Sequence, residues 1–360
     1  MSDGLENVVA AETVLSDVDG IAGRLVIRGL PLSALAGRVP YESALALLWD
    51  GFFVDLPDDL APALGAARSA VFAALSPQVS AVEQLPIFDG MRTLVSRMED
   101  GTDLDSALRL VAAPAVALAA LLARRQGHAL RAPDASLGHA ADLLRMANGS
   151  VTAAQALGLD SYLVTVIDHG LNASTFASRV VASTQAGLGS SVLAALGALK
   201  GPLHGGAPGP VLDMLDAIGT PGNAASWIAA ELARGQRLMG FGHRIYRVRD
   251  PRADALSAAI GRLKASGAVD AARMDLAATV ETTALAALAR HKPDRPLQTN
   301  VEFFTALLLE ALGLPRDSFT AVFAAGRVGG WIAHAREQAA SGRLIRPKSR
   351  YIGPAPREAA

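Results

Sequence analysis

The sequence predicts an all-α fold arranged as two domains, and three observations lead to this expectation. Alanine and leucine dominate the chain, while clusters of β-branched and aromatic residues are few, a composition that favours helices over strands. At 360 residues the chain exceeds the usual size of a single compact core. Glycine, proline and capping residues divide it into helical segments of unequal length and spacing, which argues against a solenoid of repeats.

The start of the chain departs from the helical pattern. Residues 17–20, Asp-Val-Asp-Gly, are turn formers, and they lie between the stretches 7–15 and 24–28. Two such stretches on either side of a tight turn predict a small N-terminal β-hairpin.

From residue 40 onward the pattern predicts one helix after another. Capping boxes begin at Ser80 and Thr152, and Gly201, Gly267 and Gly313 are typical of the left-handed residue that ends a helix. The predicted helices span residues 40–51, 57–74, 80–99, 103–126, 136–148, 152–158, 174–199, 207–218, 221–235, 251–266, 270–290, 301–312 and 318–341.

The longest apolar run, 110–123, is shorter than a bilayer span and contains Pro114, so we expect a buried helix there. The N-terminal residues MSDGLENVVAAE lack the basic region and apolar stretch of a signal peptide. The sequence therefore predicts a cytoplasmic protein with no membrane partner.

Charge and composition exclude several classes of function. The formal net charge is −1, which gives no electrostatic reason to expect a nucleic-acid partner. The chain has no cysteine, which excludes disulfides, a thiol nucleophile and thiolate metal sites. An HExxH motif and a Gly-x-Ser-x-Gly elbow are also absent, so we expect neither a metal site nor serine hydrolysis. Arginine supplies nearly all the positive charge, and it binds carboxylates and phosphates bidentately.

Three short segments carry proton-handling side chains among glycines, prolines or a helix start: His204, His243 and Glu302. Two histidines and a carboxylate, brought together, could remove a proton from carbon and polarise two carbonyl groups. This combination predicts an enzyme of carbon–carbon bond chemistry. The alternative for His204 is an exposed turn histidine, although the glycines beside it let a ligand approach closely.

His243 follows Gly240-Phe241-Gly242 and precedes arginines 244, 247, 249 and 252. A lone Gly-x-Gly with no strand before it is not a dinucleotide fingerprint. The arginines predict a site for a multiply charged anion, and the alternative is a solvated basic loop.

Glu302 lies in the first turn of a predicted buried helix whose N-cap is Asn300. The alternative to a catalytic role is a first-turn acid that compensates the helix dipole. In either case we expect the helix N-terminus to keep the carboxylate ionised, and an ionised carboxylate can act as a base. Of the other histidines, His169 lies in a polar loop, His139 on an apolar helix, and His128, His291 and His334 among residues that suggest no role.

Together these segments resemble the citrate synthase family, in the order that the family has them. The resemblance spans residues 4 to about 354. The matching segments are Gly4 to Thr13, Asp168-His169 with Leu171 to Phe176, Gly201-Pro-Leu-His204-Gly-Gly-Ala, Gly240-Phe-Gly-His243-Arg-Ile-Tyr with Asp250-Pro-Arg252, Asn300-Val-Glu302-Phe, and Arg346-Pro-Lys-Ser.

The resemblance implies an all-α fold in which a large domain, residues 1–206 and 314–360, is interrupted by a smaller domain, residues 207–313, that closes over the substrates. It also implies a homodimer whose sites lie near the subunit boundary. The co-substrate would be a coenzyme A thioester, with no tightly bound cofactor and no metal.

The resemblance further implies a role for each site residue. Glu302 would deprotonate acetyl-CoA while His204 hydrogen-bonds the thioester carbonyl, and His243 would polarise the ketone of oxaloacetate. Oxaloacetate would be held by His169, Arg252 and Arg327, with Arg346 supplied by the partner subunit. The coenzyme A site would be lined by Leu238, Gly240, Phe241, Gly242, Arg247 and Asn300.

Three departures leave the exact activity open. Glu302 stands where the family commonly has aspartate, Gly170 stands where an acid often follows the histidine, and residues 85–92 lack a His-Pro-Met seen in relatives. The sequence therefore predicts citrate synthase. The alternatives are 2-methylcitrate synthase using propionyl-CoA, a catalytically silent relative that binds coenzyme A or dicarboxylate, and a citryl-CoA lyase.

Overall fold

The structure, a computed structural model, describes residues 4–5, 8–205, 208–243, 245–291, 293 and 297–354. Of the segments used in the sequence analysis, residues 1–3, Glu6, Asn7, Gly206, Ala207, Arg244 and 355–360 lie outside the described residues.

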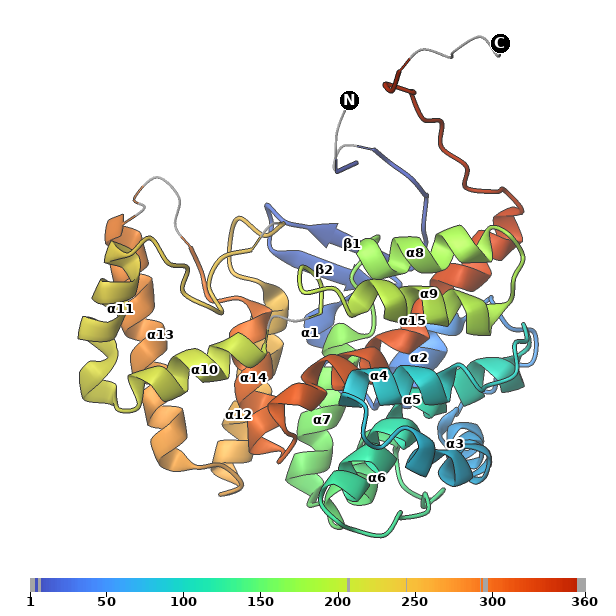
Figure 1. Ribbon diagram of the computed structural model, residues 1–360, viewed down its shortest axis with the longest axis horizontal. Coiled ribbons are helices and arrows are strands. Elements are labelled where there is room, and N and C mark those ends of the chain that lie inside the picture. Colours follow the sequence, from blue (N-terminus) through green and yellow to red (C-terminus); the bar gives the residue numbers. More distant parts are fainter. Residues whose placement is uncertain are drawn as a thin grey trace.

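The chain is mostly helical with one small sheet, so the prediction of an all-α fold with an N-terminal hairpin is confirmed (Figure 1). The helices are α1 (Leu32–Leu35), α2 (Tyr41–Trp49), α3 (Ala61–Leu75), α4 (Ile87–Val95), α5 (Leu104–Arg125), α6 (His139–Asn148), α7 (Ala153–Val166), α8 (Ala173–Ala182), α9 (Leu188–Leu199), α10 (Gly209–Ile218), α11 (Ala224–Ala233), α12 (Pro251–Ala265), α13 (Ala271–His291), α14 (Val301–Ala311) and α15 (Phe319–Ser341), with short 3₁₀ turns η1 (Ser76–Ala81), η2 (Pro221–Asn223) and η3 (Arg316–Ser318).

The sheet is antiparallel in the order β1 (Ser16–Asp19), β2 (Arg24–Ile27) and β3 (Leu30–Pro31). The predicted first strand, 7–15, was wrong, because the strand begins at Ser16 and includes residues predicted to turn. The side chain of Asp19 explains the shift: its carboxylate accepts hydrogen bonds from the amides of Ile21 and Ala22 at 3.0 and 2.8 Å, so the turn begins only after Asp19.

Two long predicted helices are also shorter or divided. The segment 174–199 forms α8 and α9, because Gln185 and Gly187 take left-handed backbone angles, with φ of 64° and 89°. In the segment 80–99 only α4 is α-helical; Ser80 lies in a 3₁₀ turn and caps nothing, and Pro86 delays the helix start. Gly267 and Gly313 have positive φ as predicted, whereas Gly201 does not.

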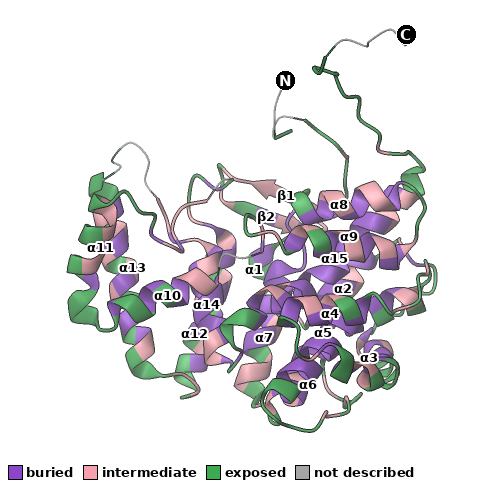
Figure 2. Ribbon diagram, viewed as in Figure 1, coloured by how far each residue is buried: buried purple, intermediate pink, exposed green. Residues whose placement is uncertain are grey.

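Helix α5 occupies the core of the larger group of helices, packed against α3, α4, α6, α9 and α15. By length and apolarity α5 could cross a membrane, but 89% of its most apolar window is buried inside the protein. The prediction of a buried helix at 110–123 is therefore confirmed. Figure 2 shows buried residues concentrated where the helices face one another, with exposed residues on outer helices such as α11.

Helices α10 to α14 gather on one side of the molecule, on the left in Figure 1, and α2 to α9 with α15 on the other. Helix α12 packs against α7 and α14, so it lies at the junction of the two groups. The segments before β1 and after α15 extend away from the helices (Figure 1) and are largely exposed.

Helix α15 approaches the end of α7 closely because small residues line its contact face. A Cβ added at Gly330 would overlap the carbonyl of Ile167, and one added at Gly326 would crowd the side chain of Val166. These glycines therefore bring Arg327 of α15 close to the loop that carries His169.

We expect Gly330→Ala to lower the free energy of unfolding by about 1–3 kcal/mol, because the added methyl group has no room. The matched control is Gly261→Ala on α12, where nothing lies within 4 Å of the new Cβ and alanine favours the helix. Urea unfolding of both variants measures the difference, and equal stabilities would contradict the packing argument.

Candidate active site

Two of the three predicted segments are joined by backbone pairing. Phe241 and Thr299 form an antiparallel bridge, with Gly242 N donating to Gln298 O at 2.8 Å and Asn300 N donating to Gly240 O at 2.9 Å. The loop before His243 is therefore fixed to the segment before α14, whose first turn carries Glu302.

Asn300 strengthens this link with both ends of its amide. Its Oδ1 accepts from Glu302 N at 3.0 Å, which caps α14, and its Nδ2 donates to Gly242 O at 2.8 Å. Gly240 has φ of 84°, and a Cβ there would lie 2.9 Å from Cβ of Phe303, so only glycine fits.

His243 is a neutral imidazole of defined tautomer. Its Nδ1 accepts from the amides of Ile245 and Tyr246 at 3.0 and 3.1 Å, so the ring proton is on Nε2. Burial, followed by the charge of Arg252, lowers the pKa of His243 to about 4. His243 Nε2 lies 3.1 Å from Nη2 of Arg252. Both groups are donors, so an acceptor such as a ketone or carboxylate oxygen would satisfy them together.

Arg252 is buried and held by one carboxylate. Asp250 accepts from Nε at 3.1 Å and from Nη2 at 2.8 Å, and its Oδ1 also accepts from Arg252 N at the start of α12. The bidentate contact fixes the plane of the guanidinium group.

His169 follows α7 and lies beside His243, with ring centroids 6.3 Å apart. Its Nε2 is 3.1 Å from the hydroxyl of Tyr246, whose ring also packs on His243 at 4.9 Å. Burial lowers the pKa of His169 well below its ordinary value, and the charges of Arg252 and Arg327 lower it further.

Arg327, on α15, is 1% exposed. Its Nε donates to the carbonyl of Val166, and its guanidinium lies 4.7 Å from the centroid of the Phe323 ring. Among the described residues, its two terminal nitrogens have no hydrogen-bond partner. Burial lowers the pKa of Arg327 to about 10, so the group stays charged at neutral pH.

His204 lies in the turn after α9, with Nε2 2.7 Å from the hydroxyl of Ser174. That hydroxyl also lies 2.8 Å from Asn172 Oδ1 and accepts from Trp331 Nε1 at 3.1 Å. Burial and then the charge of Arg327 lower the pKa of His204 to about 4, so this histidine is also neutral. Because the hydroxyl donates its single proton to Asn172 Oδ1, His204 Nε2 donates to the hydroxyl in this arrangement. A hydroxyl proton turned to His204 instead would put the ring proton on Nδ1, where it could serve a ligand.

Glu302 is the carboxylic acid of the site. Burial raises its pKa to about 7, with Arg252 opposing this and Asp250 adding to it. The expectation that Glu302 is kept ionised was therefore wrong, because burial raises its pKa and the charge of Arg252 offsets only part of the rise. Near pH 7 the acid and its conjugate base are both populated.

These groups surround one region. The charge of Arg327 acts on both His204 and His169, the charge of Arg252 acts on both His243 and Glu302, and Tyr246 contacts both His169 and His243. A cleft of about 190 Å³ opens beside it and is lined by Gly242, His243, Tyr246, Arg247, Val248, Asp250, Leu297, Gln298, Thr299 and Asn300.

The other residues assigned to the coenzyme A site, Leu238, Gly240 and Phe241, do not line this cleft. Leu238 and Gly240 are buried, and Phe241 packs on Phe303 with ring centroids 5.5 Å apart. Arg346 lies in the extended segment after α15 and is exposed, so it is not brought to the cluster within this chain. Within the described residues, no group of three or more His, Asp or Glu could hold a metal ion.

Sequence reasoning missed several residues of this region. Tyr246 and Asp250 stood in the quoted motif without a role. Tyr162 and Thr175 are fully buried, and their hydroxyls have no partner among the described residues. The interpretation that no neighbouring residue suggests a role for His334 was wrong, because His334 is buried and contacts Asp168 and Arg179.

The fold and these groups define an all-α enzyme in which buried arginines and neutral histidines face a carboxyl group of raised pKa. The chain matches the family description "Citrate synthase, C-terminal domain" over residues 4–348. It therefore belongs to the citrate synthase family, a family of condensing transferases.

Curated relatives carry two different names. The citrate synthase of Haloferax volcanii is 39% identical over 372 residues, which cover 97% of this chain and 95% of that protein. The 2-methylcitrate synthase of Mycobacterium tuberculosis is 36% identical over 366 residues, which cover 97% of this chain and 90% of that protein.

Solved structures agree on the fold. Citrate synthase from Thermotoga maritima superposes with a TM-score of 0.85 at 32% identity, covering 100% of this chain and 98% of that one. A ternary complex of the Thermoplasma acidophilum citrate synthase with carboxymethyl coenzyme A and oxaloacetate gives a TM-score of 0.85 at 26% identity, covering 100% and 98%.

We expect Asn300→Ala to lower both stability and activity, since it removes the cap of α14 and the link to Gly242. The loss of stability should be about 1 kcal/mol. Thr152→Ala is the matched control, because Thr152 caps α7 through a capping box on exposed residues. Thermal unfolding measures the loss of stability in each variant, and a turnover assay measures the loss of activity. Equal turnover in Asn300→Ala and Thr152→Ala would contradict the role of Asn300.

Proposed function

We propose that this protein condenses acetyl-CoA with oxaloacetate and water to give citrate and coenzyme A. The observation that carries the proposal is the grouping of half-buried Glu302, whose pKa is raised to about 7, with two neutral, half-buried histidines and two buried arginines. The Thermoplasma acidophilum complex, which binds oxaloacetate and a coenzyme A analogue on the same fold, supports the choice of substrates.

In the first step Glu302 removes a proton from the carbon next to the thioester carbonyl. That proton is too weakly acidic for an unaided carboxylate, so the enolate oxygen needs an aimed donor. His204 supplies it, because the low pKa of its ring keeps it a neutral hydrogen-bond donor rather than a cation.

In the second step the enolate carbon attacks the ketone of oxaloacetate, whose oxygen His243 polarises by donating a hydrogen bond from Nε2. The proton that Glu302 removed from carbon finally neutralises the new alkoxide oxygen, so Glu302 and His243 both return to their starting forms. Arg252, Arg327 and His169 hold the two carboxylates of oxaloacetate. The unpaired terminal nitrogens of Arg327 suit a carboxylate, which accepts two parallel hydrogen bonds. Water then cleaves the thioester of the condensed product and releases the coenzyme A thiol.

Coenzyme A would lie along the cleft beside Arg247 and Asn300. We further propose that residues 207–313 close over the substrates, that closure excludes water until the carbon–carbon bond has formed, and that Arg346 reaches the site of a second copy in a homodimer. The enzyme would work in the cytoplasm without a metal or a tightly bound cofactor.

The relative named 2-methylcitrate synthase favours a second candidate, in which propionyl-CoA replaces acetyl-CoA. The two substrates differ by one methylene, and one methylene in an apolar pocket changes the binding free energy by only about 1–3 kcal/mol.

A thiol-release assay with oxaloacetate and each acyl-CoA decides between the candidates. We expect release with acetyl-CoA at a higher kcat/KM than with propionyl-CoA, and the reverse order would establish the second candidate. No release with either, together with tight oxaloacetate binding in calorimetry, would identify a silent binding protein instead.

We expect Glu302→Gln to lower kcat by a factor on the order of 10²–10⁴, because the amide cannot accept the carbon proton. Oxaloacetate affinity, measured by calorimetry, should change little. The matched control is Glu310→Gln on the same helix, whose carboxylate pairs with Arg273 away from the site. Unchanged turnover in Glu302→Gln would remove this residue from the mechanism.

We expect kcat/KM to fall as the pH drops below about 7 and to level off above it. The base must be ionised to act, and the raised pKa of Glu302 means that protonation begins near neutrality rather than near pH 4.5. A pH–rate profile that stays flat down to pH 5 would show that another group removes the proton.

A further inference from the structure

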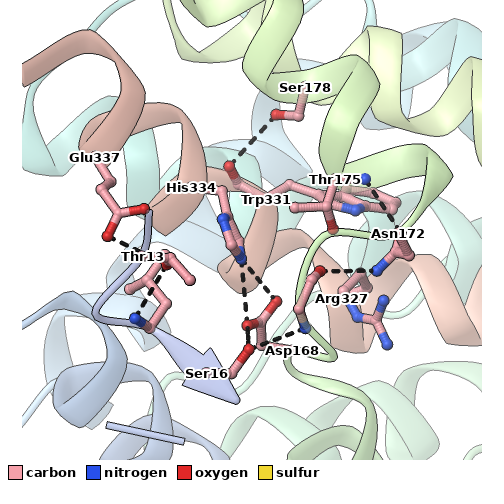
Figure 3. Close-up of polar contacts among 12 residues, drawn as sticks. Thr13, Ser16, Asp168, Asn172, Thr175, Ser178, Arg327, Trp331, His334 and Glu337 are labelled. Carbon is pink, nitrogen blue, oxygen red and sulfur yellow. Dashed lines mark hydrogen bonds and ion pairs between the residues drawn. The ribbon is translucent and has the colours of Figure 1, made fainter. Parts of the chain in front are cut away.

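His334 lies in a buried polar network next to the oxaloacetate end of the site (Figure 3). Its Nε2 is 3.2 and 3.3 Å from the two carboxylate oxygens of Asp168, and its Nδ1 is 3.0 Å from Nη1 of Arg179. Both Asp168 and His334 are fully buried.

The partners of His334 fix its tautomer. Arginine has only donors, so Nδ1 must accept from Arg179, and the ring proton is then on Nε2. Burial raises the pKa of Asp168, but the electrostatic attraction of His334 and its hydrogen bond, followed by the charge of Arg327 and the hydrogen bond from Ser16, outweigh this and lower the pKa below its ordinary value. His334 therefore donates one hydrogen bond to a buried carboxylate.

Asp168 in turn fixes the residues on both sides of His169. Its Oδ2 accepts from the hydroxyl of Ser16 at 2.5 Å, and that hydroxyl accepts from the amide of Gly170 at 2.9 Å. His169 therefore lies between Asp168, whose carboxylate is hydrogen-bonded, and Gly170, whose backbone amide is hydrogen-bonded. Gly170 has φ of 61°, so the chain turns sharply just after the histidine.

The other end of the network is equally well anchored. Arg179 donates to Glu337 Oε2 at 2.5 Å and to Gln338 Oε1 at 2.9 Å, and Glu337 Oε1 accepts from Val14 N at 2.9 Å. On the far side of Asp168, a Cβ at Gly330 would lie 3.2 Å from Oδ1. Glycine at position 330 therefore lets helix α15 lie directly against the carboxylate of Asp168.

We propose that His334, acting through Asp168 and Ser16, is a positioning residue that sets the place of the His169 imidazole for dicarboxylate binding. This rests on the proposed function, in which His169 binds oxaloacetate. The network touches the oxaloacetate end of the site and not the cleft assigned to coenzyme A. Its loss therefore weakens oxaloacetate binding and leaves binding of the acyl-CoA nearly unchanged.

The experiment compares His334→Leu, His334→Gln and Ser16→Ala in the full chain. Leucine removes both hydrogen bonds, glutamine keeps a donor and an acceptor, and alanine at Ser16 cuts the link to Gly170 without disturbing the core. We expect His334→Leu and Ser16→Ala to raise the Kd and KM for oxaloacetate by a factor on the order of ten, which corresponds to the loss of about one hydrogen bond's worth of positioning. KM for acyl-CoA should change less than about twofold, and His334→Gln should recover most of the affinity.

The matched control is His139→Leu. His139 is also fully buried, stacks on Tyr41 and has no partner for either ring nitrogen among the described residues. Its replacement should leave both KM values unchanged. If His334→Leu and Ser16→Ala leave the oxaloacetate constants unchanged, or alter both KM values equally, His334 is only structural and the proposal falls.

Amide hydrogen exchange at Gly170 separates this proposal from the proposed function. Faster exchange in His334→Leu and Ser16→Ala, with no oxaloacetate binding by the unaltered protein, would overturn the proposed function and retain the positioning of His169. Unchanged exchange at Gly170 in both variants would overturn the positioning itself, whatever the protein binds.

Discussion

The buried guanidinium of Arg327 is the group on which the rest of the site depends. It is held from behind by the carbonyl of Val166 and the ring of Phe323, while its terminal nitrogens lack partners among the described residues. A buried cation without a direct carboxylate partner is costly, so the site is complete only when an anion arrives. The same charge disfavours a second cation nearby, and so it helps to keep both His204 and His169 neutral.

Burial shifts the pKa values of acids and bases in opposite directions, and in the proposed mechanism both shifts serve one reaction. Burial lowers the pKa values of His204 and His243 to about 4. Both rings are therefore uncharged at neutral pH and can donate a hydrogen bond. Burial raises the pKa of Glu302 to about 7, which makes the carboxylate a stronger base than one in water. A single water-poor region therefore prepares the proton acceptor and the proton donors together.

The sequence predicts those features whose causes are local. Glycines around His204 and His243, and the cap at Asn300 before Glu302, are visible in short segments, as is the burial of α5 in its apolar run. The sequence does not predict what depends on distant residues. His334 contacts Asp168, which lies 166 residues away in the sequence. The pKa of Glu302 is raised mainly by burial, which depends on residues outside its own helix. The division of 174–199 was missed although Gly187 and Gly189 lie in its middle, because the apolar helical patterns on either side, 176–182 and 192–199, were treated as one helix.

The small sheet connects the segments that carry His169 and His243. At one end of β1 the hydroxyl of Ser16 holds the amide of Gly170, next to His169. Just beyond the other end the carbonyl of Gly20 accepts from Arg247 N at 2.8 Å, four residues after His243. A Cβ at Gly20 would overlap the carbonyl of Ile245, so the hairpin and this loop are in close contact. A strand of four residues thus fixes the spacing between an imidazole carried by the α7–α8 loop and one carried by the loop before α12. The hairpin, the element least like the rest of this helical fold, therefore belongs to the architecture of the site.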